Sequence, residues 1–200
     1  MAEQTETPDL RRARRERGRN AVLDTAFEVF MNGNERPTAA EIARRAGVST
    51  SSLFRYFASI DDLRLQVASR FLDDHRDVLD PQPPTGADYD QRRRLFVDLR
   101  IRLATTVGPM SQRLQGRLVD EPGLLPIQTT FGRLLADQVT TYFDPELSML
   151  TKARRDDLVG LVDSLTSIEA FRILHEIHDR SEPQVQRSWR SAIDTLLRTP

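Results

Sequence analysis

The 200-residue sequence contains no cysteine, which excludes disulfide bonds and thiolate metal ligands. It also lacks a run of about 18 apolar residues, the minimum for a membrane-spanning helix. No stretch alternates apolar and polar residues as a strand does, and no phosphate-cradling glycine loop, nucleophile elbow or paired metal-binding histidine motif is present. We therefore expect an all-α, cytoplasmic protein without enzyme activity, cofactor, metal or membrane partner.

The net charge of -1 conceals a basic N-terminal region. Residues 10–60 contain ten arginines and five acidic residues, a balance of +5, which leaves -6 for the rest of the chain. A locally positive surface attracts nucleic acid even when the whole chain is nearly neutral. This region is therefore the candidate for contact with an anionic partner.

The N-terminal third shows a long helix followed by two short ones. Residues 1–10 are polar and without periodicity, which predicts a disordered leader. Apolar residues then recur at helical spacing from Arg11 until Asn32, where a glycine follows. Thr38 and Glu41 form the sequence pattern of a capping box for a helix over 39–45.

A second short helix follows the first after a glycine. Gly47 interrupts the chain, and Ser49 is placed to cap a helix that carries Leu53, Phe54 and Phe57. Two short helices around a glycine-containing turn are typical of a helix-turn-helix. The pattern predicts a DNA-binding domain over 11–58.

The remainder of the chain predicts further helices separated by proline and glycine. Three prolines and a glycine in residues 80–86 form the clearest linker. Breaks are expected at 108–109, 121–123, 144–145 and 181–183, for a total of about nine helices. The expected helices cover 59–79, 88–107, 111–120, 124–143, 147–178 and 182–197.

Residues 20–63 resemble the DNA-binding domain of the TetR family of bacterial regulators. Two positions depart from the family pattern, because Phe54 stands where the family usually has tyrosine and Ile60 where it usually has lysine. Each change removes a phosphate contact. The matching residues are Ala26, Phe27, Phe30, Gly33, Thr38, Ile42, Ala43, Ala46, Gly47, Val48, Ser49, Leu53, Tyr56, Phe57, Ser59 and Leu63.

The resemblance implies a repressor that a small-molecule effector releases from double-stranded operator DNA. It also implies that residues 59–200 form a helical domain that binds the effector and makes the homodimer. The alternative function is a dimeric adaptor with the same fold and weakened or lost DNA binding. Retention on duplex DNA that depends on salt distinguishes the two, since phosphate contacts release counterions.

The residue types in the second short helix suit a major groove. Small hydroxyl side chains allow the helix tip to approach the bases, and Arg55 can make a bidentate contact with guanine. Thr38 begins the preceding helix, where its hydroxyl and nearby N–H groups suit a phosphate. The predicted DNA-binding residues are Thr38, Ser49, Thr50, Ser51, Ser52, Phe54, Arg55 and Tyr56, with Arg15 and Arg19 of the first helix.

Two apolar stripes near the C-terminus predict either a four-helix dimer interface or packing inside one chain. The candidate interface residues are Leu161, Leu165, Ile168, Val185, Trp189, Ile193 and Leu196. An effector pocket is expected between the middle helices, although core packing is the alternative role for each residue. The candidate pocket residues are Phe96, Leu99, Met110, Arg113, Leu114, Phe131, Leu135 and Tyr142.

Overall fold

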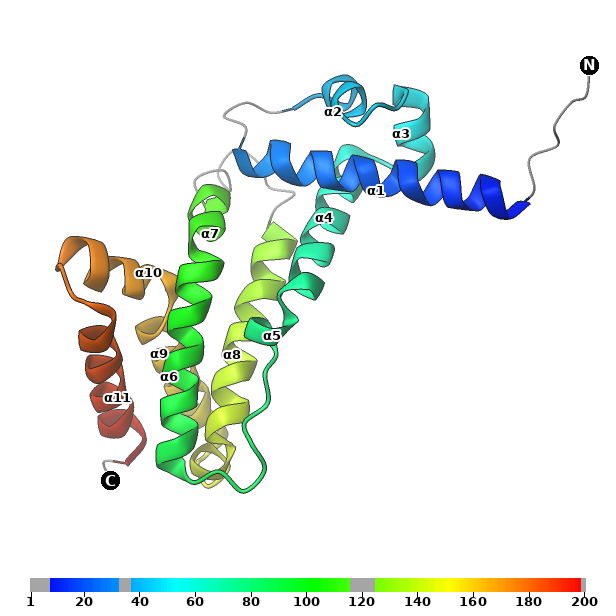
Figure 1. Cartoon of the computed structure of the whole chain (residues 1–200). Helices are drawn as coiled ribbons and strands as arrows, with labels where there is room; N and C mark the ends of the chain where they lie inside the picture. The colour runs from blue at the N-terminus through cyan, green and yellow to red at the C-terminus, as the bar shows by residue number, and fades with distance from the viewer. Residues whose placement is uncertain (1–7, 33–36, 116–124, 199–200) are drawn as a thin grey trace, which may run out of the picture. The chain divides into compact units, whose positions relative to one another are not determined.

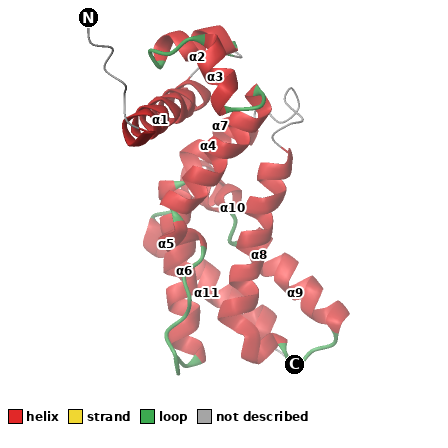
Figure 2. Cartoon of the chain, turned by 90° about the vertical axis from the view of Figure 1, so that its right-hand side faces the viewer, coloured by secondary structure: helices red, strands yellow, loops and turns green. Residues whose placement is uncertain are grey.

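The computed structural model describes residues 8–32, 37–115 and 125–198 (Figure 1). Over these residues every regular element is a helix, which confirms the all-α prediction (Figure 2). The described residues form eleven α-helices and one π-helical segment, more than the nine expected for the whole chain. The chain divides into two compact units, Met1–Asp74 and His75–Pro200.

The N-terminal unit contains four helices, in which α1 packs against α2, α3 and α4. Because Leu63 and Val67 of α4 join the same apolar core, the division falls after Asp74 and not at the predicted 58/59 boundary. Residues 8–10 of the expected leader are helical, and residues 1–7 lie outside the described part of the chain. The helices are α1 (Pro8–Asn32), α2 (Ala39–Arg45), α3 (Thr50–Tyr56) and α4 (Ile60–Asp74).

Side-chain caps begin both short helices, as the sequence predicts. The Thr38 hydroxyl oxygen accepts a hydrogen bond from Glu41 N at 3.2 Å, and Ser49 Oγ accepts one from Ser52 N at 3.1 Å. Each satisfies an N–H group that has no partner within its helix. Gly47 between them has φ +68°, a left-handed conformation that favours glycine.

The C-terminal unit is built around α6, which packs against α5, α7, α8, α10 and α11. Its core is mostly apolar and includes the only tryptophan of the chain, Trp189, at 1% exposure. The helices are α5 (Arg76–Leu79), α6 (Tyr89–Thr106), α7 (Gly108–Gln115), α8 (Leu125–Leu147), α9 (Lys152–Leu165), α10 (Ile168–Arg172), the π-helix η2 (Ile173–Ile177) and α11 (Glu182–Arg198).

Several predicted boundaries in this unit are wrong. The expected 147–178 helix is interrupted after α9, because the Thr166 hydroxyl donates to Val162 O at 2.7 Å and Ser167 caps a new helix. The expected break at 108–109 is the start of α7, since proline is tolerated in a first helical turn. The 144–145 break appears as a kink within α8 at Phe143, whose φ is -120°.

The expected 59–79 helix is also divided. It consists of α4 and α5, and His75 between them has φ -112° and ψ 23°, outside the helical region. The expected 111–120 helix corresponds to α7, and its predicted end falls on residues 116–124, which lie outside the described part. The 80–86 linker is confirmed as a loop.

Candidate nucleic-acid interface

The helix α3 has one face in the core and one face in solvent. Leu53 is fully buried and Phe57, just after the helix, is 1% exposed, so these two side chains anchor α3 on the N-terminal core. Ser49, Thr50 and Ser51 are exposed, and Ser52 is half-buried. The predicted hydroxyl-bearing tip therefore faces outward, where small side chains leave room for a second molecule.

Arg55 lies on the exposed side of α3, held lightly against its own helix. Its Nη2 atom donates to Ser52 Oγ over 3.4 Å, a long bond, and its guanidinium lies 5.6 Å from the centre of the Tyr56 ring. Neither contact consumes the five donors of the guanidinium. The side chain is thus available for a bidentate acceptor.

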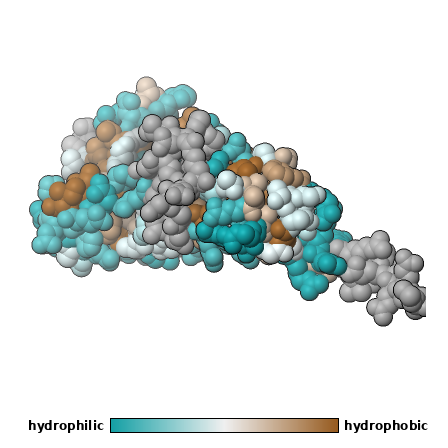
Figure 3. Space-filling view, turned by 90° about the horizontal axis from the view of Figure 1, so that it is seen from above, coloured by the Kyte–Doolittle hydropathy of each residue, from teal (hydrophilic) through white to brown (hydrophobic). Residues whose placement is uncertain are grey.

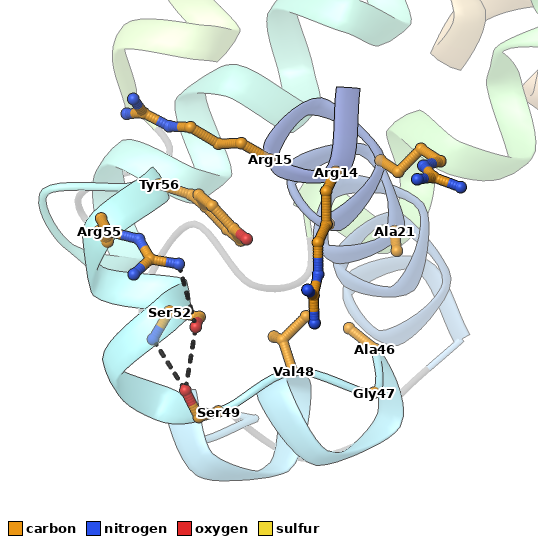
Figure 4. A pocket seen from close by; sticks show the side chains of 12 residues that line it. Arg14, Arg15, Ala21, Ala46, Gly47, Val48, Ser49, Ser52, Arg55 and Tyr56 are labelled. Atoms are coloured by element: carbon orange, nitrogen blue, oxygen red, sulfur yellow. Dashed lines mark hydrogen bonds between the residues drawn. The ribbon is translucent and has the colours of Figure 1, made fainter. Parts of the chain in front are cut away.

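The first turns of α1 lie beside α3 and bring arginines close to this short helix. A groove of about 1100 Å³ runs between α1 and the turn that joins α2 to α3 (Figure 4). The predicted Arg15 is one of its residues, together with Arg14 and Arg17, which belong to the arginine-rich segment 11–19 that the sequence indicates for DNA contact but were not predicted individually. The groove residues are Arg14, Arg15, Arg17, Gly18, Ala21, Ala46, Gly47, Val48, Ser49, Ser52, Arg55 and Tyr56.

Helical spacing is the signal that would have found the missed groove residues. Positions 14, 17, 18 and 21 are separated by three or four residues, so they share one face of α1. The hydroxyl caps and Arg55 come from a different element, and only the packing of α1 brings the two sets together. The result is a groove lined by three arginines of α1 on one side and by Ser49, Ser52 and Arg55 on the other.

Arg19 was predicted to contact DNA, but the structure places it inside the N-terminal unit. Its guanidinium donates to Gln66 Oε1 of α4 and lies 5.5 Å from the centre of the Phe57 ring. The Gln66 amide in turn donates to Asp62 Oδ1 at 2.9 Å. Arg19 therefore ties α1 to α4, and we leave it out of the interface.

The carboxylate of Asp62 is the last acceptor in this series of hydrogen bonds from Arg19 through Gln66. The hydrogen bond from Gln66 lowers the pKa of its carboxyl, as do the bond from Ala58 N at 2.7 Å and the charge of Arg19, against a smaller desolvation effect. The ionised carboxylate thereby holds the start of α4.

The two departures from the family pattern have different surroundings. Phe54 is 49% exposed on α3, where it presents an apolar ring without a hydroxyl. Ile60 is half-buried and packs against the N-terminal core. Ile60 therefore has a packing role that a lysine would not fill, whereas nothing within the chain explains the exposed Phe54.

The C-terminal candidates for an effector pocket lie mostly in the core of their unit. Phe96, Leu99, Leu135 and Tyr142 are 6% exposed or less. Met110 and Phe131 are half-buried, while the side chains of Arg113 and Leu114 lie outside the described residues. Phe96 and Tyr142 have ring centres 5.7 Å apart, so the predicted residues do meet between α6 and α8.

Three buried polar side chains lie in this region. The sequence indicated Gln138 as a possible polar contact for an effector, whereas Arg92 and Arg100 were missed. Arg100 donates from Nη2 to Leu135 O at 2.6 Å and forms an ion pair from Nη1 to Asp163 Oδ1 at 2.9 Å. Burial lowers the pKa of the Arg100 guanidinium, and the charge of Asp163 opposes this shift. Gln138 donates to Val78 O at 3.1 Å and Leu79 O at 2.7 Å.

Arg92 is the third of these buried polar side chains. It forms a bidentate pair with Glu146 at 2.7 and 2.8 Å and donates to Tyr142 O at 2.6 Å. The bond to Glu146 raises the pKa of Arg92. Residues 92, 96 and 100 are spaced four apart, so the burial of Phe96 would have indicated that both arginines point inward.

The predicted dimer interface needs correction at four positions. Val185, Trp189 and Ile193 are 1% exposed or less and Ile168 is 4% exposed within a single chain. The alternative, packing inside one chain, therefore holds for these residues, because α11 buries its apolar stripe against its own unit. Leu165 and Leu196 are half-buried, and Leu161 is 51% exposed.

The surface seen in Figure 3 is mostly hydrophilic, with apolar side chains in scattered groups. None of the described helices is long and apolar enough to cross a membrane. The described residues contain no cluster of three or more histidines and carboxylates that would hold a metal ion.

The short helices α2 and α3 each begin with a side-chain cap, and a glycine in the left-handed conformation lies between them. The exposed polar helix α3 is anchored on α1. This arrangement defines a helix-turn-helix domain. The model of the bacterial regulatory proteins of the tetR family matches residues 22–67. Residues 22–67 are therefore a DNA-binding domain of the tetR type.

Relatives share both the sequence and the fold. The chain is 32% identical over 103 residues to the HTH-type transcriptional repressor LfrR of Mycolicibacterium smegmatis, a match that covers 50% of this chain and 53% of LfrR. The match thus spans about half the length of the curated relative. Among solved structures, the candidate transcriptional regulator SCO7518 of Streptomyces coelicolor A3(2) is 26% identical, with a TM-score of 0.64 and coverage of 93% of this chain and 99% of that one.

The multidrug binding protein EbrR, solved in complex with imidazole, shares the fold alone. It is 18% identical with a TM-score of 0.51, and the alignment covers 91% of this chain and 96% of EbrR.

Proposed function

We propose that this protein is a homodimeric transcriptional repressor that leaves its operator DNA when a small-molecule effector binds the C-terminal unit. The exposed, hydroxyl-rich face of α3 carries the proposal, because it stands on a helix-turn-helix core that the family model matches. It is a non-enzymatic, cytoplasmic function.

In this proposal α3 enters the major groove. Arg55 makes the bidentate contact with guanine, and Thr50 and Ser51 contact neighbouring bases. The exposed Thr38 at the start of α2 and the arginines of the α1 groove contact phosphates. Phe54 offers an apolar surface, which suits a thymine methyl group in place of the phosphate contact that a tyrosine would make.

The dimer supplies a second recognition helix one turn of DNA away, roughly 34 Å. Since Val185, Trp189 and Ile193 are occupied within the chain, we assign the interface to apolar side chains that remain exposed on α9 and η2. Leu161 is 51% exposed, Ile173 40% and Ile177 63%. Half-buried Leu165 and Leu196 complete this surface.

We assign the effector region to the space between α6 and α8, where Phe96 contacts Tyr142 and Arg100 and where Gln138 is buried. Gln138 Oε1 has no hydrogen-bond partner among the described residues, so an effector with a donor group would satisfy it. Effector binding then favours a dimer with a different spacing of the two recognition helices, and the DNA is released.

An electrophoretic mobility shift on DNA from the protein's own upstream region tests the function. We expect a specific shift for the wild type and a loss of roughly tenfold to a hundredfold in affinity for Arg55→Ala, since a bidentate base contact contributes about 1–3 kcal/mol. Arg94→Ala removes an exposed arginine from α6 and is the matched control. The absence of a shift at low salt would favour the adaptor function.

Sedimentation tests the interface separately. Leu161→Glu places a charge on the proposed surface and is expected to yield monomers, because an unpaired charge at a buried interface is costly. Met149→Glu changes a residue that is 85% exposed and should leave the dimer intact. A dimer that survives Leu161→Glu would place the interface elsewhere.

A further inference from the structure

Gly18 of α1 is in close contact with the recognition helix. A Cβ atom at this position would lie 2.7 Å from Tyr56 Oη and 3.3 Å from Tyr56 Cζ. Cβ atoms of other residues essentially never approach another atom so closely. Gly132 and Gly160 also lie within helices, yet a Cβ there would meet nothing within 4 Å. Gly18 is therefore a site where the end of the phenol occupies the place of a side chain.

Tyr56 is restrained on its other sides. Its ring packs edge-on to Phe57, with centres 6.4 Å apart, and against the N-terminal core, while the Arg55 guanidinium lies 5.6 Å from its centre. Figure 4 shows the side chain pointing from α3 toward α1. The ring can make room for a larger residue at position 18 only by moving α1 away or by swinging outward beside Arg55.

The arginine-bearing turns of α1 lie just before this contact. The buried residues of α1 begin at Val22, whereas residues 12–17 are exposed. Arg14, Arg15 and Arg17 line the same groove as Ser49 and Arg55. The direction of these turns relative to α3 therefore depends on how closely α1 approaches α3 at Gly18 and Tyr56.

We propose that the Gly18–Tyr56 contact is a positioning device that docks the start of α1 against α3, so that the arginines of α1 and the recognition helix grip one stretch of duplex DNA together. The ligand of the groove is the sugar-phosphate backbone next to the bases that α3 contacts, since phosphate oxygens are the partners that forked guanidinium groups prefer. The inference rests on the proposed DNA-binding function and adds a residue that makes no DNA contact itself.

The dependence of affinity on salt measures the number of phosphate contacts, at roughly 0.9 per contact in the slope of log K against log [salt]. For Gly18→Ala we expect a slope smaller by about 2 to 3, equal to the loss of the three α1 arginines. Tyr56→Phe removes the atom nearest the added methyl group, so Gly18→Ala with Tyr56→Phe should regain most of the slope. Tyr56→Phe alone is the reference for the double variant, so that any contact of the Tyr56 hydroxyl with DNA is subtracted from the comparison.

Gly160→Ala is the matched control, with the same chemical change on a helix but with open space around it. The triple variant Arg14→Gln, Arg15→Gln, Arg17→Gln should lose the same slope as Gly18→Ala, and Gly18→Ala added to it should have no further effect. Alanine has a higher helix propensity than glycine, so the variant stays helical, which circular dichroism checks.

A Gly18→Ala protein with the wild-type slope would overturn the inference and leave the proposed function standing. A reduced slope that Tyr56→Phe does not restore would also overturn it, because the loss would then come from another cause. A wild-type protein without salt-dependent binding to DNA would overturn both.

Discussion

The N-terminal unit and the C-terminal unit bury different kinds of side chain. The core of the N-terminal unit is a cluster of apolar residues, and none of its described polar side chains is as deeply buried. In the C-terminal unit Arg92, Arg100, Gln138 and Thr166 are buried. A surface that contacts a large polyanion needs exposed groups, whereas a site for a small molecule needs polar groups inside an apolar core. The N-terminal unit thus has the burial pattern that suits the proposed contact with DNA, and the C-terminal unit the pattern that suits the proposed small-molecule effector.

Replacement of Arg100 should have the largest effect on stability, at the buried ion pair. Arg100→Met leaves the Asp163 carboxylate without its partner, and we expect a loss of about 4 kcal/mol in the free energy of unfolding. Trp189 is the only tryptophan and lies in this unit, so its fluorescence during urea denaturation reports the change. Arg94→Met on the exposed side of α6 is the control. Arg100→Met with Asp163→Leu should regain stability, and no regain would mean that the pair is not the cause.

Replacement of Leu53 tests the apolar core of the N-terminal unit. Leu53→Ala opens a cavity at a fully buried position and should cost about 3 kcal/mol. Far-ultraviolet circular dichroism should show an earlier loss of helix while Trp189 fluorescence keeps its wild-type midpoint. Phe54→Ala, at the next and exposed position, should leave both signals unchanged. A coincident shift of both probes would contradict the assignment of the Leu53 effect to the N-terminal core alone.

Removal of the side-chain cap of α3 should have a smaller effect on the free energy of unfolding. Ser49→Ala removes the oxygen that accepts from Ser52 N, which should cost about 1 kcal/mol in the N-terminal unit. Thermal denaturation followed by circular dichroism measures it. Ser51→Ala, which removes an exposed hydroxyl within the same helix, should be nearly neutral, and equal effects for the two serines would rule out the cap as the cause.

Replacement of Asp62 should have the smallest effect on stability, and this effect should depend on pH. The pKa of Asp62 is lowered from 3.8 in the folded protein, so the ionised group stabilises the N-terminal unit above that value. This stability is lost as the pH falls through the lower, folded pKa. Asp62→Asn should therefore reduce the melting temperature slightly at pH 7, with a difference that disappears in strong acid. Asp61→Asn is the neighbouring control, and a pH-independent difference would contradict the linkage.

The comparison also explains which features could be predicted from the sequence. Thr38 and Ser49 act on N–H groups three residues away, so their role as caps follows from the local pattern. Arg100 and Gln138 have partners 35 to 63 residues distant, and no local pattern specifies such contacts. The groove beside α1 could be predicted in part. Helical spacing indicates which face of α1 bears Arg14, but it does not indicate that α3 packs beside that face.

The apolar stripe of α11 shows a second limit. Val185, Trp189 and Ile193 recur at helical spacing, which predicts that the stripe is buried but not which chain covers it. Their burial against the same chain was one of two outcomes that the pattern allowed. The exposed Leu161, Ile173 and Ile177 form no continuous apolar stripe in the sequence, because they are spread over α9 and η2. The sequence pattern therefore indicated them less clearly.

The predominance of arginine has a consequence for regulation by modification. Lys152 is the only lysine in the sequence, and it lies at the start of α9 in an ion pair with Asp156 at 2.5 Å. Lysine acetylation neutralises an amine, but a guanidinium is not its target. Acetyltransferases therefore have no side-chain amine to modify in the helix-turn-helix unit, and the positive charge of the α1 groove stays constant when the acetylation state of the cell changes.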